Sequence, residues 1–174
     1  MSPIDLILLG MVLERPQSAY ELQKDVAYHQ LPRWTHISVP SVYRSVLRLQ
    51  EQGYLQSRVV RGRKKADKAV YVITEAGKER FHELLRHFAA QSVPLQLDFN
   101  VVVTNLNKVS PEEACALVAQ LRGSLCASME ESAVLAARYA DIPPVGRAVF
   151  EQQARLYWAL LAWLDDFEKQ LAQE

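Results

Sequence analysis

The stretch of residues 38–74 constrains the fold of this chain most, because two hydrophobic periodicities follow each other across a single glycine, Gly53. Before Gly53, apolar residues recur at helical spacing and predict a short helix with one buried face, formed by Val42, Val46 and Leu49. After Gly53, the β-branched and aromatic residues of 54–60 and 69–74 are typical of two strands. A helix followed directly by a β-hairpin predicts the last helix and the wing of a winged helix-turn-helix domain.

The predicted helix begins at Ser38, whose hydroxyl suits an N-cap, and places Pro40 in its first turn. Its free side carries Arg44 and Arg48, one helical turn apart. The turn of the hairpin, RGRKKADK, is almost entirely cationic and contributes Arg61, Arg63, Lys64, Lys65 and Lys68. A solvated charge run is one interpretation of this turn, and contact with a polyanion is the other.

The residues on either side complete the domain over residues 1–92. Residues 3–13 predict a helix that is apolar on nearly all sides and therefore sandwiched in a core. A second helix runs to about His29 and opens with a capping box of Ser18 and Glu21. Another helix follows the hairpin from Thr74.

Residues 93–174 predict a helical domain. A short helix is expected over 97–106, and Ser110-Pro-Glu-Glu is a strong start for a long helix that reaches Tyr139. After a proline-containing break, the last helix runs over about 145–172. Two long helices joined by a short turn predict an antiparallel hairpin.

The last helix carries more apolar residues than one partner helix can bury. Its main stripe, with spacings of three, four and seven, consists of Val149, Leu156, Leu160, Trp163, Phe167 and Leu171. A second set also includes Tyr157, Trp158, Leu161 and Leu164. A helix that is apolar over more than half its circumference needs further partners, which a four-helix cluster within the chain or a homodimer would supply.

The distribution of charge differs between the two halves, although the net charge is zero. Residues 1–92 contain 14 Lys and Arg against 9 Asp and Glu, whereas residues 93–174 contain 6 against 11. A basic first half and an acidic second half indicate that the first half meets a polyanion and the second does not.

Other features bear on compartment and chemistry. Cys115 and Cys126 lie roughly 16 Å apart along the predicted helix, too far for a disulfide, so we interpret both as buried apolar residues in a reducing compartment. Asp5 interrupts the apolar N-terminal run, which is too short to span a membrane or act as a signal peptide, so we expect a cytoplasmic protein. With six glycines, no phosphate-binding loop and no metal-ligand or nucleophile motif, we expect neither an enzyme nor a cofactor.

Three motifs resemble the PadR family of bacterial transcriptional regulators: Leu6-Ile-Leu-Leu-Gly10 with Tyr20-Glu-Leu22, Ser38 through Leu55, and Tyr71-Val-Ile-Thr74-Glu-Ala-Gly77. The start at Ser110 and the long final helix resemble the larger subgroup with an extended helical C-terminal domain, which includes virulence-gene activators. The resemblance implies a DNA-binding winged helix over 1–92 and a helical dimerisation domain over 93–174. It also implies double-stranded operator DNA as a partner.

Each candidate contact has an alternative. Arg44 and Arg48 suit guanine edges in the major groove, or else contact only phosphate or pair with Glu51. Ser38 and Ser41, at the helix N-terminus, suit a phosphate as well as a cap. Tyr43 either packs in the hydrophobic core or contacts DNA. The five wing cations are expected to contact phosphates or the minor groove.

We favour a homodimer formed through the last helix, because dimers read two DNA half-sites. Tyr157, Trp158 and Trp163 line either the dimer core or a pocket for a small aromatic or hydrophobic effector, as in some family members. The expected function is therefore a homodimeric, sequence-specific DNA-binding regulator, a repressor by resemblance. The alternative is an adaptor that keeps the fold without binding DNA, although an adaptor has no need of a cationic wing tip.

Overall fold

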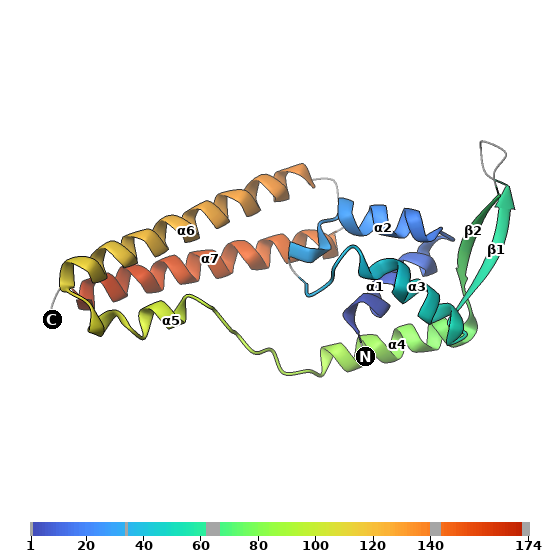
Figure 1. The fold of residues 1–174 in the computed structure, drawn as a ribbon, viewed down its shortest axis with the longest axis horizontal. Helices are drawn as coiled ribbons and strands as arrows, with labels where there is room; N and C mark the ends of the chain where they lie inside the picture. The colour runs from blue at the N-terminus through green and yellow to red at the C-terminus, as the bar shows by residue number, and fades with distance from the viewer. Residues whose placement is uncertain (1, 34, 62–66, 140–143, 172–174) are drawn as a thin grey trace. The chain divides into compact units, whose positions relative to one another are not determined.

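The computed structural model describes residues 2–33, 35–61, 67–139 and 144–171. These residues form helices and one two-stranded antiparallel sheet, so the predicted fold class, mainly α with a small β-hairpin, is confirmed (Figure 1). The chain divides into two compact units, Met1–Pro94 and Leu95–Glu174. The assignment of residues 1–92 to DNA binding and 93–174 to dimerisation stays a prediction.

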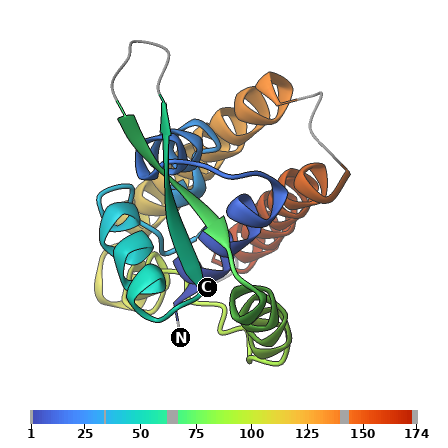
Figure 2. The same ribbon diagram turned by 90° about the vertical axis from the view of Figure 1, so that its right-hand side faces the viewer.

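The first unit has the element order of a winged helix-turn-helix domain. Three helices precede the hairpin and one follows it, and Figure 2 views the hairpin from the front with the third helix beside it. The elements are α1 (Pro3–Glu14), α2 (Ala19–Tyr28), the 3-10 turn η1 (Leu31–Arg33), α3 (Ser41–Glu51), β1 (Leu55–Arg61), β2 (Asp67–Ile73) and α4 (Glu75–Ala89).

Helix α1 lies at the centre of this unit, as its all-round apolar sequence predicts. It contacts α3, α4 and β2. Leu8 and Leu9, neighbours in the sequence, are both fully buried, which requires packing on more than one side of the helix. The core is completed by other fully or almost fully buried side chains: Leu22, Val26, Val42, Val46, Leu49, Leu55 and Leu84.

The sheet is extended by a contact that the sequence did not reveal. β1 and β2 pair in register from Leu55 opposite Ile73 to Arg61 opposite Asp67. Gln17, between α1 and α2, exchanges two backbone hydrogen bonds with Tyr71 of β2, at 3.2 and 2.8 Å. The connection between the first two helices is therefore tied to the wing.

The start of α3 differs from the prediction. The helix begins at Ser41, and Pro40 at the N-cap has helical backbone angles. Ser38 does not cap the helix with its hydroxyl; instead its carbonyl oxygen accepts from the backbone amide of Ser41 at 3.1 Å and from the Ser41 hydroxyl at 2.6 Å. Because Pro40 already adopts the helical conformation, the extended N-cap expected at Ser38 is replaced by a tight turn.

The second unit is a helical hairpin preceded by short turns: α5 (Asn100–Val103), the 3-10 turn η2 (Leu106–Lys108), α6 (Pro111–Arg138) and α7 (Pro144–Leu171). Ser110 caps α6 by accepting a hydrogen bond from the amide of Glu113 at 3.2 Å, as predicted. α6 and α7 run antiparallel and pack along their length (Figure 1). The buried residues between them include Val118, Leu125, Leu161 and Leu164.

An ion-pair network also joins the two long helices. Arg122 of α6 forms a two-pronged contact with Glu168 of α7, at 3.2 Å from Nε and 2.8 Å from Nη2, and a second ion pair with Asp165 at 2.6 Å. Hydrogen bonds to these carboxylates raise the pKa of Arg122.

The expectation that both cysteines are buried is wrong for Cys115, which is exposed, while Cys126 is half-buried. Both are unpaired. The buried face of α6 near Cys115 is formed by Ala114 and Val118, so Cys115 falls on the outer side. Among the described residues, no helix combines the length and hydrophobicity needed to cross a membrane.

Candidate nucleic-acid interface

Helix α3 packs one face into the core and presents Tyr43 and Arg44 to solvent. Tyr43 is 57% exposed, which excludes the core-packing alternative for this residue. Two hollows flank the exposed face. The first, the α1–α3 hollow, contains Arg44 and Arg48; the second, the α2–wing hollow, contains Tyr43 and Lys68.

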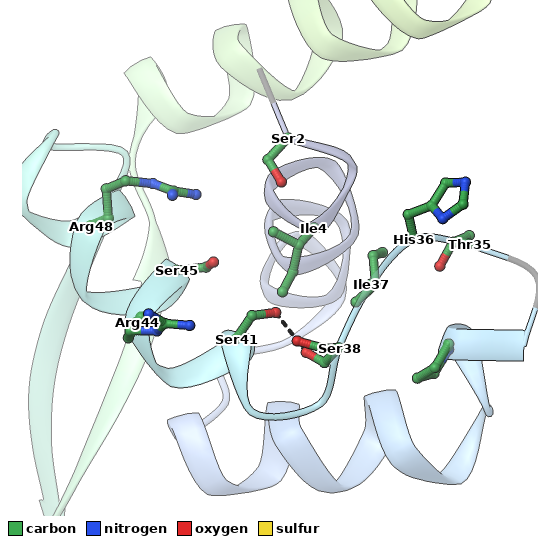
Figure 3. Close-up of a pocket in the computed structure, with 11 residues that line it drawn as sticks. Ser2, Ile4, Thr35, His36, Ile37, Ser38, Ser41, Arg44, Ser45 and Arg48 are labelled. Carbon is green, nitrogen blue, oxygen red and sulfur yellow. Dashed lines mark hydrogen bonds between the residues drawn. The ribbon is translucent and has the colours of Figure 1, made fainter.

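The α1–α3 hollow has a volume of about 830 Å³ and lies between the N-terminus of α1, the loop that follows η1, and α3 (Figure 3). Four of the residues predicted from the sequence come together there: Ser38, Ser41, Arg44 and Arg48. Its full lining is Ser2, Ile4, Pro32, Thr35, His36, Ile37, Ser38, Ser41, Arg44, Ser45 and Arg48.

Arg48 pairs with a residue that the sequence reasoning missed. Its guanidinium donates to the carboxylate of Asp5 on α1, and the predicted alternative partner, Glu51, is not the one it contacts. The Asp5 side chain is only 13% exposed. The signal was visible in the sequence, because a lone carboxylate in an otherwise apolar helix needs a buried partner. Arg48 is thus held in place, while Arg44 has no ion-pair partner among the described residues.

The α2–wing hollow has a volume of about 620 Å³ and lies on the other side of α3. Tyr20 and Lys24 from α2 line it together with Tyr43, Lys68 and Tyr71. Tyr20 is 74% exposed, because Leu22 and Val26 form the buried face of α2. Tyr20 and Lys24 therefore join the candidate interface.

Lys68 is the wing cation whose environment the structure describes, and it is not free. Its Nζ donates to Glu21 Oε1 at 2.8 Å. The other oxygen of Glu21 accepts from the amide and hydroxyl of Ser18 at 2.8 and 2.7 Å, which completes the predicted capping box of α2. The hydrogen bond from Lys68, followed by those from Ser18, lowers the pKa of Glu21 to about 2. Lys68 therefore gains an ion-pair partner on folding, which α2 supplies.

Replacing Glu21 with glutamine should make the protein less stable at neutral pH and flatten its stability between pH 4.5 and 2. Glutamine preserves the capping box but loses the charge that holds Lys68. Because the folded pKa of Glu21 lies below its ordinary value of 4.5, its stabilising contribution is complete above pH 4.5 and is lost as the pH falls towards 2. The pair is partly exposed, so we expect a loss of about 0.2–1 kcal/mol, measured by urea unfolding at several pH values.

A matched control is Glu75→Gln, which removes an ion pair of similar length, 2.7 Å to Lys78, from a glutamate that is 85% exposed. That substitution should change the free energy of unfolding little. An identical pH profile for wild type and Glu21→Gln would contradict the assignment of the acid-sensitive contact to Glu21.

The remaining wing cations are described in part. Arg63, Lys64 and Lys65 lie outside the described residues, and Arg61 is described only as the last residue of β1, opposite Asp67. Their contacts with nucleic acid stay a prediction from the sequence.

The residues predicted to form the dimer interface and the effector pocket lie on several sides of α7. Leu161 and Leu164, placed in the second set from the sequence, are buried against α6, and Leu160, Phe167, Leu171 and Tyr157 pack partly against the same cluster. Val149 is half-buried, whereas Leu156, Trp158 and Trp163 are exposed by 44, 64 and 38%. The ring of Trp163 stacks with Phe99 and with Phe167, at centroid distances of 6.1 and 5.5 Å.

Among the described residues, no group of three or more His, Cys, Asp or Glu side chains could hold a metal ion.

Three helices, a two-stranded wing and an exposed face on the third helix define the first unit as a winged helix-turn-helix domain, the class to which many transcription regulators belong. Residues 8–83 match the model of the transcriptional regulator PadR-like family. The winged-helix domain therefore matches the PadR-like family of transcriptional regulators, and the resemblance found in the sequence is confirmed.

Solved structures share the fold over almost the whole chain. Bacillus subtilis PadR in complex with operator DNA is 16% identical, with a TM-score of 0.79, and the alignment covers 98% of this chain and 99% of that one. The same protein in complex with p-coumaric acid is 15% identical, with a TM-score of 0.79 and coverage of 100 and 99%. The Vibrio cholerae virulence activator AphA is 18% identical, with a TM-score of 0.69 and coverage of 98% of both chains. A search of curated proteins found no match.

Proposed function

We propose that this regulator is a homodimeric, sequence-specific DNA-binding repressor that acts in the cytoplasm. The observation that carries the proposal is the exposed face of α3, where Tyr43 and Arg44 project between two hollows lined by cationic and hydroxyl side chains. A helix of this kind fits the major groove, and the flanking side chains suit the phosphates on either side. The operator complex of Bacillus subtilis PadR supports the same assignment for this fold.

The side chains of the proposed DNA interface would have different roles. Arg44 is exposed and without an ion-pair partner in the described part of the chain, so its planar guanidinium is available to bind O6 and N7 of a guanine. Arg48 is held by its ion pair with Asp5. It therefore suits a contact at a fixed position better than the reading of a base edge. Tyr20, Lys24 and Lys68 in the α2–wing hollow would contact the backbone.

Selection of DNA duplexes from a random library tests this function directly. The full chain should enrich two related half-sites about one helical turn apart, because each subunit presents one α3. The Arg44→Ala variant should lose preference at one position in each half-site, at a cost of about 1–3 kcal/mol. Arg86→Ala, an exposed substitution on α4, serves as the control and should keep the wild-type motif. Failure of the wild type to enrich any motif would contradict sequence-specific binding.

Apolar side chains exposed on both flanks of the stripe of α7 that packs against α6 support the dimer. Leu156 and Trp158 remain 44 and 64% exposed after α6 has packed against the helix, whereas Leu160 packs partly against the hairpin core. Such exposed apolar side chains mark an interaction surface. A second copy of the chain is the partner that would also supply the second α3 for a second half-site.

A Leu156→Asp/Trp158→Asp variant should have half the mass of the wild type in light scattering, because charges at an apolar interface cannot be paired there. These positions are better suited than Leu160, whose replacement would also damage the hairpin core. The control is Ala127→Asp on the exposed side of α6, with circular dichroism to verify the helices. An unchanged mass in the double variant would exclude Leu156 and Trp158 from the interface.

A small aromatic or hydrophobic effector is the last part of the proposal. The ring of Trp163 lies in a stack with Phe99 and Phe167, a surface on which a flat aromatic ligand fits. The p-coumaric acid complex of Bacillus subtilis PadR supports an aromatic acid as the first ligand to try. Titration of p-coumaric acid should quench tryptophan fluorescence in the wild type and in Trp158→Phe but much less in Trp163→Phe. Equal responses of the three proteins would contradict this location.

A further inference from the structure

The α1–α3 hollow concentrates hydrogen-bond donors in a way that ordinary packing does not explain. Five hydroxyl-bearing residues line it together with one histidine and two arginines: Ser2, Thr35, Ser38, Ser41, Ser45, His36, Arg44 and Arg48. Figure 3 shows the arginine side chains and the Ser45 hydroxyl directed from α3 towards the space in front of α1.

Ser45 is the most informative of these residues. It is only 4% exposed, and its hydroxyl has no hydrogen-bond partner among the described residues. The hydroxyl itself is not sealed off, because no side-chain polar atom of the described residues is both buried and unpaired; it opens on the hollow, where a bound acceptor can take the place of solvent. By contrast, the hydroxyls of Thr35 and Ser41 already donate to backbone carbonyls, at 2.7 and 2.6 Å.

The site depends on side chains rather than on the free amides of a helix N-terminus. The amides of Ser41 and Val42 donate to the carbonyls of Ser38 and Val39, at 3.1 and 3.2 Å. These two amides are therefore not free to bind a phosphate together with Ser38 and Ser41. Of the donors that remain, the Ser45 hydroxyl and the two guanidinium groups all belong to α3.

The charge of the hollow favours an anion. Arg44 and Arg48 both line it, whereas Asp5, which pairs with Arg48, does not. Asp5 accepts a hydrogen bond from Nη2 of Arg48, and the other N–H groups of the guanidinium can donate to another partner. Two planar, positively charged guanidinium groups and one hydroxyl can all donate hydrogen bonds to the oxygens of a tetrahedral anion, which they suit better than a neutral ligand.

We propose that the α1–α3 hollow binds a phosphate-type oxyanion, with Ser45 donating its hydroxyl and Arg44 and Arg48 providing the charge. The oxyanion is either a backbone phosphate of DNA or a free phosphate-bearing small molecule. The first source rests on the proposed function and gives Arg44 to a phosphate instead of a guanine edge, the alternative role that the sequence leaves open for it. The second source does not rest on the proposed function.

Thermal unfolding of the full chain in inorganic phosphate, against chloride at the same ionic strength, tests the site without DNA. The wild-type midpoint should rise by on the order of 5 °C at ten times the dissociation constant. Ser45→Ala and Arg44→Gln should lose most of the rise. Arg58→Gln, on the exposed side of β1 outside this hollow, should retain it. No rise in the wild type, or equal rises in all four proteins, would overturn the proposal.

DNA binding distinguishes the two sources. If a backbone phosphate occupies the hollow, Ser45→Ala should bind DNA several-fold more weakly than wild type, and inorganic phosphate should compete with DNA for the wild type. If the occupant is a free anion, Ser45→Ala should lose the phosphate response and keep wild-type DNA affinity. A wild type that responds to phosphate but binds no DNA would refute the proposed function and leave the oxyanion site standing.

Discussion

Gly77→Ala is expected to destabilise the N-terminal unit by about 1–3 kcal/mol. Gly77 lies in the first turn of α4, where its amide donates to the capping hydroxyl of Thr74 at 3.0 Å. A Cβ atom at this position would lie 2.2 Å from the backbone oxygen of Tyr54 and 2.7 Å from Cγ1 of Ile73. The backbone oxygen cannot give way as a flexible side chain would, so α4 would have to shift from the start of β1.

Gly123→Ala is the matched control for this substitution. Gly123 lies inside α6, and beyond its own chain neighbours and the adjacent backbone of the helix no atom lies within 4 Å of the Cβ that alanine would add. This variant should be more stable by about 0.5–1 kcal/mol, the usual advantage of alanine over glycine inside a helix. Unfolding in urea measures both, and a Gly77→Ala protein as stable as the wild type would contradict the close packing of α4 on β1.

Replacing Arg63, Lys64 and Lys65 together with glutamate should weaken DNA binding by roughly two to three orders of magnitude at 0.1 M salt. Each phosphate contact adds about 0.9 to the logarithmic salt dependence, so three lost contacts account for most of that change. Repulsion between the new carboxylates and the backbone would add to it. Fluorescence anisotropy with a labelled duplex measures the affinity.

The control is a triple variant with the same change in net charge on the other unit, Arg138/Arg147/Arg155→Glu. These exposed residues belong to the acidic half of the chain and should affect DNA binding far less. Equal losses in the two triple variants would mean that net charge, rather than the wing, governs binding.

Much of the fold could be predicted because local patterns and tertiary packing agree. The capping box of Ser18 and Glu21, the cap at Ser110 and the buried stripe of α3 all occur as the sequence predicted. α1 could be recognised as a central helix because it is apolar on every side.

The side-chain partners could not be predicted in the same way, because they come from distant parts of the chain. Asp5 and Arg48 are 43 residues apart, and Glu21 and Lys68 are 47 apart. Both pairs alter the expected interface, since they anchor cations that the local sequence presents as free.

Periodicity alone did not decide which residues of α7 contact α6. The helix is apolar around most of its circumference, so several stripes fit the sequence equally well. Packing against α6 selects Leu161 and Leu164, and it leaves Leu156 and Trp158 on the outside. The choice depends on the partner helix, which spacing within one helix does not reveal.

The dependence of DNA affinity on salt tests most directly whether the winged helix is a DNA-binding domain. Between 50 and 200 mM salt, the logarithm of the wild-type affinity should fall steeply, with a slope of about −0.9 for each phosphate neutralised. The Arg63/Lys64/Lys65→Glu variant should have a slope that is shallower by about 2.7 for each bound wing. A wild-type affinity that does not change with salt, or an unchanged slope in the variant, would contradict this account.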